Sequence, residues 1–134
     1  MPAVDTNVFL RLLLDDDEDQ ARAAHSLQRT HPPLFVSHVV LAEMAWVLAS
    51  AYGFKRDRLR TLVQMLLETD GISLQEPQLV RAALAAFEVS RADFSDCLML
   101  AVAESAGMAP LATFDERLAK LPGTRKLGRK RKQP

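Results

Sequence analysis

The chain has 134 residues, of which 49% are hydrophobic, and 17 basic side chains balance 17 acidic ones. This length is typical of one domain, and the apolar fraction excludes a disordered chain. Six of the basic residues lie between Arg125 and Lys132, which leaves 11 basic against 17 acidic side chains in residues 1–123. We therefore expect one acidic domain over residues 1–123, or to residue 127 if a final strand belongs to it, and a flexible basic tail at 128–134.

Short apolar runs alternate with longer segments of helical spacing along the whole chain. The Pro32-Pro33 pair, Gly53 and Gly107 mark the points where predicted helices end. We expect strands at residues 2–5, 34–37, 72–74, 111–113 and 125–127. We expect helices at residues 7–14, 15–28, 38–52, 55–68, 77–88, 93–106 and 115–121. This alternation predicts an α/β fold with a mainly parallel sheet flanked by helices.

Other features narrow the class of protein further. The single cysteine, Cys97, cannot form an internal disulfide, and we expect it to be a small buried side chain. The first residues, MPAVDTNVF, lack a basic stretch before an apolar one, which predicts no signal peptide. No apolar run approaches the length of a membrane span. We therefore expect a cytoplasmic protein with no membrane association.

Most familiar catalytic motifs are absent from the sequence. The five glycines do not form a phosphate-binding loop, and the three histidines do not combine with Cys97 in a zinc-binding spacing. The remaining candidates are carboxylates. Asp5 ends a predicted buried strand, where a lone acid is poorly solvated, and Asp115 follows another strand, where it could also be a helix cap. The carboxyl ends of parallel strands lie along one sheet edge, so these two acids should lie near each other.

Glu43 occurs within an apolar stretch of its predicted helix. On a helix its side chain falls between Val39, Trp46 and Val47. A carboxylate in such a stripe is costly unless a positive group compensates it. The alternatives are a glutamate that reaches the rim or pairs with an arginine, and a glutamate that helps to hold a metal.

Asp93 and Asp96 lie on one face of the helix predicted at residues 93–106. Asp93 can be the N-cap of that helix, whereas Asp96 lies next to core-like neighbours such as Leu100. Residues 15–19 are also acidic, and we interpret them as a solvated helix start. Acids gathered at strand ends and helix starts repel each other unless a cation binds, and a site made only of oxygen atoms favours Mg²⁺ or Mn²⁺.

Four segments in this order resemble the PIN domain family, and more closely its VapC-type toxin ribonucleases. They are VDTNVFLRLLL at 4–14, SHVVLAEMAWVL at 37–48, ADFSDCLMLAVAESAG at 92–107 and LATFDERLAKL at 111–121. The resemblance implies a three-layer sandwich with helices around a parallel sheet. It also implies endoribonuclease activity with Mg²⁺ or Mn²⁺, dimerisation, and inhibition by a small VapB-type antitoxin.

The resemblance assigns roles to individual residues. Asp5 and Asp96 match the principal metal ligands, Glu43 and Asp115 complete the acidic quartet directly or through water, and Asp93 is an additional acid. Thr6, Asn7 and Thr113 match polar positions that support the carboxylates. Trp46, Tyr52 and the helix at 55–68 are candidate dimer contacts. The RNA target, the number of metal ions and the antitoxin's identity are not encoded in any motif of the chain.

Two other classes compete with the nuclease hypothesis. One is a PIN fold that only binds RNA or protein, although such a module has no need for four gathered acids. The other is a receiver-like signalling domain, but the chain lacks an adjacent acid pair after the first strand and a lysine at the end of a late strand. The basic tail has two interpretations, a solubilising terminus or an arm that contacts phosphates.

Overall fold

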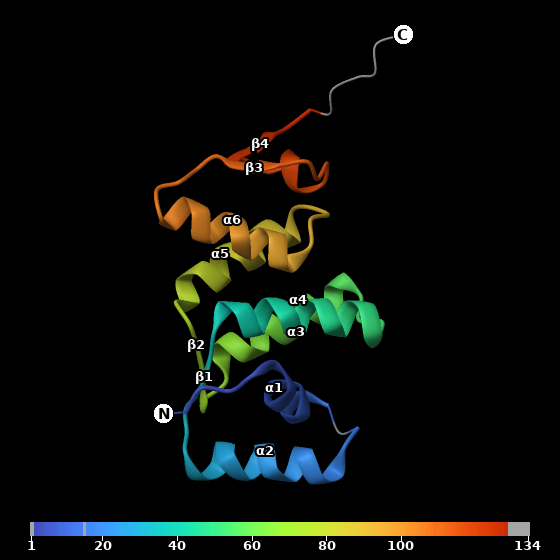
Figure 1. Ribbon diagram of the computed structural model, residues 1–134, viewed down its shortest axis with the longest axis vertical. Helices are drawn as coiled ribbons and strands as arrows, with labels where there is room; N and C mark the ends of the chain where they lie inside the picture. Colours follow the sequence, from blue (N-terminus) through green and yellow to red (C-terminus); the bar gives the residue numbers. More distant parts are fainter. Residues whose placement is uncertain (1, 15, 129–134) are drawn as a thin grey trace. The chain divides into compact units, whose positions relative to one another are not determined.

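A computed structural model describes residues 2–14 and 16–128 of the chain (Figure 1). These residues form two compact units, and the division between them falls between Pro77 and Gln78. The acidic residue 15 and the basic tail from residue 129 lie outside the described residues.

The first unit contains four helices and two short strands among its described residues. In chain order they are α1 (Thr6–Leu13), α2 (Glu18–Thr30), β1 (Leu34–Val36), α3 (His38–Ala51), α4 (Arg56–Glu68) and β2 (Ile72–Leu74). Its largest fully buried side chains include Phe9, Leu34, Met44, Leu48 and Val63. These residues come from α1, β1, α3 and α4, so the core of this unit joins elements from most of its length.

The strands of the first unit pair in parallel, as the alternating pattern predicts. β1 pairs with β2 in the register Leu34 to Ile72, and Ala3 forms a single parallel bridge to Phe35. The strand predicted at residues 2–5 is therefore only a bridge. Pro2 lacks an N–H group, and Asp5 already belongs to the start of α1, so little chain remains for strand pairing.

Polar side chains set the starts of three helices in this unit. The carboxylate of Asp5 accepts a hydrogen bond from the Val8 N–H at 2.9 Å and begins α1. Asp17 begins α2 by accepting from the Gln20 N–H at 3.0 Å, and Ser37 begins α3. Each of these residues satisfies an N–H group that has no partner within its helix. The helix starts are thus decided by local sequence.

The second unit contains two helices, a short 3₁₀ helix and two strands among its described residues. In chain order they are α5 (Pro77–Glu88), which begins at the last residue of the first unit, α6 (Phe94–Ser105), β3 (Leu111–Thr113), η1 (Leu118–Lys120) and β4 (Thr124–Lys126). The rings of Phe87 and Phe94 pack edge to face with centroids 5.8 Å apart. Cys97 is buried, as predicted from its isolation in the sequence. Gly107 ends the α6 segment with a positive φ of 71°, a conformation that favours glycine.

β3 and β4 also pair in parallel, with Leu111 opposite Thr124. The helix predicted at residues 115–121 is wrong in extent, because only the 3₁₀ turn Leu118–Lys120 forms. Leu121 is extended, with φ −84° and ψ 145°, because the following Pro122 disfavours helical backbone at the residue before it. The α/β class and the parallel strand pairing are confirmed. No helix among the described residues combines the length and apolar character required to cross a membrane.

Candidate metal centre

The most strongly perturbed acid of the described residues is Asp96, in the first turn of α6. Its side chain is half-buried beside Leu100, which is buried. Burial raises the pKa of Asp96 above its ordinary value of 3.8, and the nearby carboxylates of Asp93 and Asp115 raise that pKa further. The three acids therefore interact electrostatically within the second unit.

Asp93 and Asp115 reach this group from two different loops. Asp93 lies at the N-cap position of α6, as predicted, but its side chain makes no capping hydrogen bond. Asp115 follows β3, and its carboxylate accepts a hydrogen bond from the Leu118 N–H at 2.8 Å. Thr113 orders the same loop, because its hydroxyl accepts from the Asp115 N–H at 3.0 Å. We call Asp93, Asp96 and Asp115 the acidic triad.

The negative charge of the acidic triad is not offset by a basic side chain of the described residues. Within the described part of the chain, none of its three carboxylates forms an ion pair with a lysine, arginine or histidine. Among all described residues, no three His, Cys, Asp or Glu side chains are already arranged to hold a metal ion. The three carboxylates nevertheless suit a hard divalent cation, because such cations prefer oxygen ligands. A bound cation would also offset the repulsion that makes ionisation of neighbouring carboxyl groups unfavourable.

Asp5 and its neighbours belong to the first unit. Asp5 is exposed, although Val4 before it is buried, so the expectation of a poorly solvated acid at this position is wrong. At the start of α1, one oxygen of this exposed carboxylate is used as the helix cap. Thr6 is half-buried in the first turn, and the exposed Asn7 donates a hydrogen bond from Nδ2 to Gln20 Oε1 at 3.3 Å.

Glu43 is also exposed, so the apolar neighbours on either side of it along the helix do not withdraw its carboxylate from water. Val39 and Trp46, its neighbours along α3, are 74% and 65% exposed. The buried side of α3 consists of Leu41, Met44, Ala45 and Leu48. A helix that is apolar around most of its circumference has no unique buried face in its sequence, so its packing partners select one.

The basic side chains of the described residues differ in their availability to a ligand. Arg11 is paired with Asp16, and its side chain is only 12% exposed, so it is unsuited to contact RNA. Arg58 lies over the ring of Phe54, 3.8 Å from its centroid. Arg81 and Arg91 are exposed in the second unit.

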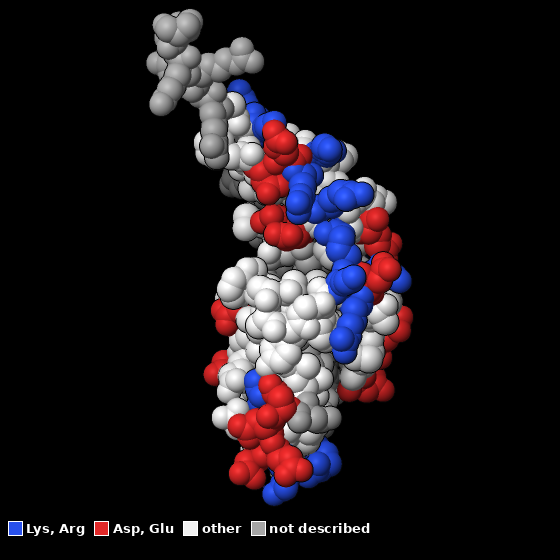
Figure 2. Space-filling model, turned by 90° about the vertical axis from the view of Figure 1, so that its right-hand side faces the viewer, with Lys and Arg blue, Asp and Glu red and all other residues white. Residues whose placement is uncertain are grey.

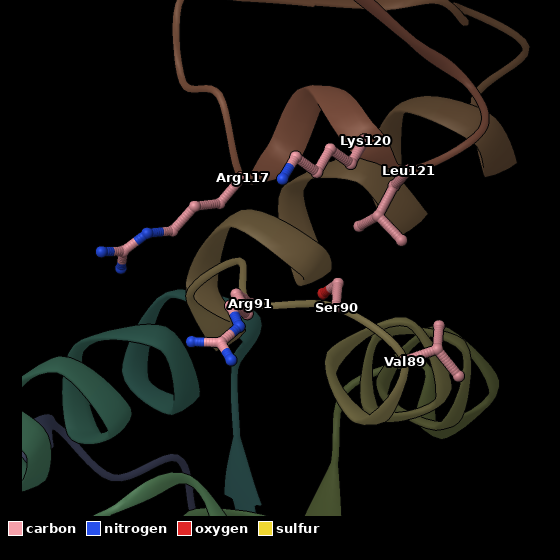
Figure 3. Close-up of a pocket in the computed structure, with 6 residues that line it drawn as sticks. All are labelled: Val89, Ser90, Arg91, Arg117, Lys120 and Leu121. Atoms are coloured by element: carbon pink, nitrogen blue, oxygen red, sulfur yellow. The ribbon is translucent and has the colours of Figure 1, made fainter.

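A pocket of about 390 Å³ in the second unit brings together cations that the sequence did not connect. It is lined by Val89, Ser90, Arg91, Arg117, Lys120 and Leu121, and in Figure 3 the Arg91 and Arg117 side chains extend toward the same side. In the sequence, the one sign of this pocket is that its arginines lie close to acids of the triad, since Arg91 precedes Asp93 by two residues. Figure 2 shows lysine and arginine side chains gathered beside acidic ones on one face of this unit.

The fold and the acidic triad together define an α/β protein with an oxygen-rich candidate cation site. A family model described as PIN domain matches residues 3–123, and the chain belongs to the PIN domain family. A relative from Aquifex aeolicus (strain VF5), named VapC ribonuclease, is 24% identical over 124 residues. That match covers 90% of this chain and 92% of the relative.

Proposed function

We propose that this protein is a toxin of the VapC type, a divalent-metal-dependent endoribonuclease that hydrolyses RNA phosphodiester bonds. The observation that carries the proposal is the uncompensated acidic triad, in which Asp93 and Asp115 add to the burial that raises the pKa of Asp96. Family membership and the VapC ribonuclease relative support the same activity. A cation is the simplest partner for carboxylates that otherwise repel one another.

The proposed site consists of five acidic side chains and three polar side chains that support them. Asp5 and Asp96 are the principal ligands of Mg²⁺ or Mn²⁺, and Glu43 and Asp115 act directly or through water. Asp93 is an additional acid, and Thr6, Asn7 and Thr113 are supporting positions. When bound, the cation supplies an activated water and neutralises charge on the phosphodiester.

The chain's own residues prepare this chemistry in distinct ways. Asp96 is partly withdrawn from water, so its ionised form gains more from a cation than an exposed aspartate does. Asp115 has one carboxylate oxygen engaged by the Leu118 N–H, which orients the group at the end of β3. The Asp93 side chain makes no capping bond, so both of its oxygens are available. Asp5 is likewise oriented by the Val8 N–H.

The partners follow from the same proposal. The substrate is RNA, the inhibitor is a small VapB-type antitoxin, and both meet the protein in the cytoplasm. We also propose a homodimer, for which Trp46, Tyr52 and the helix α4 are contact candidates. Trp46 is 65% exposed and Tyr52 is 40% exposed. Exposed tryptophan and tyrosine side chains are enriched at protein interfaces.

RNA cleavage by the wild type and by Asp96→Asn tests the activity. The purified proteins are compared on a mixture of structured RNAs with Mg²⁺, Mn²⁺ or EDTA. We expect metal-dependent cleavage by the wild type and a loss of at least about a hundredfold in the variant, since even residues behind metal ligands change activity by 10–100-fold. Asp19→Asn removes an exposed acid of α2 and should leave cleavage unchanged.

Three results would contradict the proposal. Cleavage by the wild type that persists in EDTA would exclude the metal, and equal cleavage by Asp96→Asn would exclude the site. If folded wild-type protein, freed of any antitoxin, cleaves nothing, the non-catalytic binding module becomes the better description. The missing preformed group of three ligands among the described residues is the observation that favours that alternative.

A further inference from the structure

The cationic pocket of the second unit contains three basic side chains from two loops. Arg91 lies in the loop between α5 and α6, whereas Arg117 and Lys120 belong to the turn before η1 and to η1 itself. All three side chains belong to exposed residues. Leu121 is buried and gives the pocket an apolar side, and in Figure 3 the Arg91 and Arg117 side chains extend away from it.

The loops that carry these cations also carry the acidic triad. Arg91 precedes Asp93 by two residues, and Arg117 follows Asp115 by two residues. Consecutive Cα atoms are 3.8 Å apart, so each of these arginines has its Cα within about 7 Å of the Cα of its acid. The pocket therefore lies close to the acidic triad within the second unit.

None of the three basic side chains of the pocket forms an ion pair with a carboxylate of the described residues, even though acids are close in the chain. By contrast, Lys126 pairs with Glu116 at 3.2 Å in the same unit. Three unpaired cations together raise the electrostatic potential locally and cost free energy by mutual repulsion, which an anionic ligand relieves.

We propose that the pocket formed by Ser90, Arg91, Arg117 and Lys120 binds a backbone phosphate of RNA next to the one that is cut. This inference rests on the proposed function and adds a positioning site to it. The two guanidinium groups can donate paired hydrogen bonds to phosphate oxygens, and Lys120 adds a point charge. A polyanionic strand suits both sites, because one phosphate meets the cation of the acidic triad while its neighbour enters the pocket.

RNA binding by a double variant tests this pocket without requiring catalysis. The affinity of a short single-stranded RNA is measured by fluorescence anisotropy in EDTA over a range of salt concentrations. Arg117→Gln with Lys120→Gln should weaken binding about tenfold or more at low salt, and its salt slope should fall by about 0.7, the value for one phosphate of a single strand. The matched control, Arg22→Gln with Arg29→Gln, removes two exposed cations of α2 outside the pocket and should retain the wild-type slope.

Cleavage kinetics show whether the pocket positions RNA or takes part in chemistry. With Mg²⁺ the pocket variant should have a KM raised about tenfold and a kcat close to that of the wild type, because the phosphate contact is the same in the ground and transition states. Arg117→Lys retains the charge and should recover part of the lost affinity. Thermal unfolding of all variants establishes that they are folded.

The outcomes separate the pocket from the nuclease proposal. A wild type that cleaves RNA, together with a pocket variant of unchanged salt slope and KM, would overturn the pocket alone. A wild type that binds RNA through the pocket but never cleaves would sustain the pocket and overturn the nuclease. Loss of antitoxin binding in the pocket variant with RNA binding intact would assign the pocket to an acidic protein segment and overturn the phosphate assignment.

Discussion

Two groups of acidic side chains in this protein have similar composition and opposite surroundings. The first is the acidic start of α2, residues 16–19. Asp16 pairs with Arg11 and also accepts a hydrogen bond from the Tyr52 hydroxyl at 2.7 Å. Asp17 caps α2. Nearly every carboxylate of this group has a partner or a helix dipole to offset its charge.

The acidic triad of the second unit is built differently. Asp93 makes no capping bond, Asp96 is half-buried, and within the described residues none of the three acids has a cationic partner. Only Asp115 resembles the α2 group, because it accepts one backbone hydrogen bond. The number of acidic side chains in a group therefore does not show whether the group binds a cation. The hydrogen bonds and ion pairs of those side chains do distinguish a structural group from one that lacks a counter-charge.

The largest difference should appear when a divalent cation is added. A cation that binds only the folded protein stabilises it by about 2.7 kcal/mol at a hundredfold excess over its Kd. We expect Mn²⁺ to raise the Tm of the wild type and of Asp19→Asn, and to leave the Tm of Asp96→Asn unchanged. Equal shifts in all three proteins would place the cation outside the acidic triad.

A smaller effect is expected from Asp17. Asp17→Ala removes the cap of α2 and should lower the free energy of unfolding by about 1 kcal/mol, whereas Asp17→Asn should retain most of it. Urea unfolding measures both values. RNA cleavage should be the same in both variants, and a hundredfold loss of cleavage in Asp17→Asn would remove the distinction between the two acidic groups.

The smallest effect concerns pH and Asp96 without metal. The folded protein has a raised pKa at this residue, so protonated Asp96 contributes stability that is complete below its ordinary pKa of 3.8 and is lost as pH rises through the raised value. Asp96→Asn resembles the protonated form. In EDTA its Tm should therefore match that of the wild type at acidic pH and exceed it at neutral pH.

The triad itself provides the control for this titration. Asp93→Asn removes one of the two neighbouring charges that raise the pKa of Asp96. In a protein that already carries Asp93→Asn, the substitution Asp96→Asn should therefore raise the Tm at neutral pH by less than it does in the wild type. A gain that is independent of pH would mean that the effect comes from packing rather than charge.

The order of helices and strands was predictable because it depends on neighbours in the chain. Ser37 and Asp17 provide the side-chain oxygens that begin their helices, and Gly107 permits the conformation that ends the α6 segment. The PIN resemblance was likewise carried by short local segments and is confirmed by the family match over residues 3–123. The main local error, the helix expected at 115–121, arose where Pro122 limits the residue before it.

The surroundings of the acids depended on contacts between distant residues. Nothing near Glu43 in the sequence shows that α3 buries its other side. Likewise, nothing near Asp16 in the sequence shows that the hydroxyl of Tyr52 donates a hydrogen bond to it. The assignment of Asp5, Glu43, Asp96 and Asp115 to one metal centre stays a prediction. Local hydrogen bonds and dihedral preferences act over a few residues and are readable from sequence. Burial, charge coupling and the pocket of Arg91, Arg117 and Lys120 require the folded chain, because electrostatic and packing energies depend on distance in space.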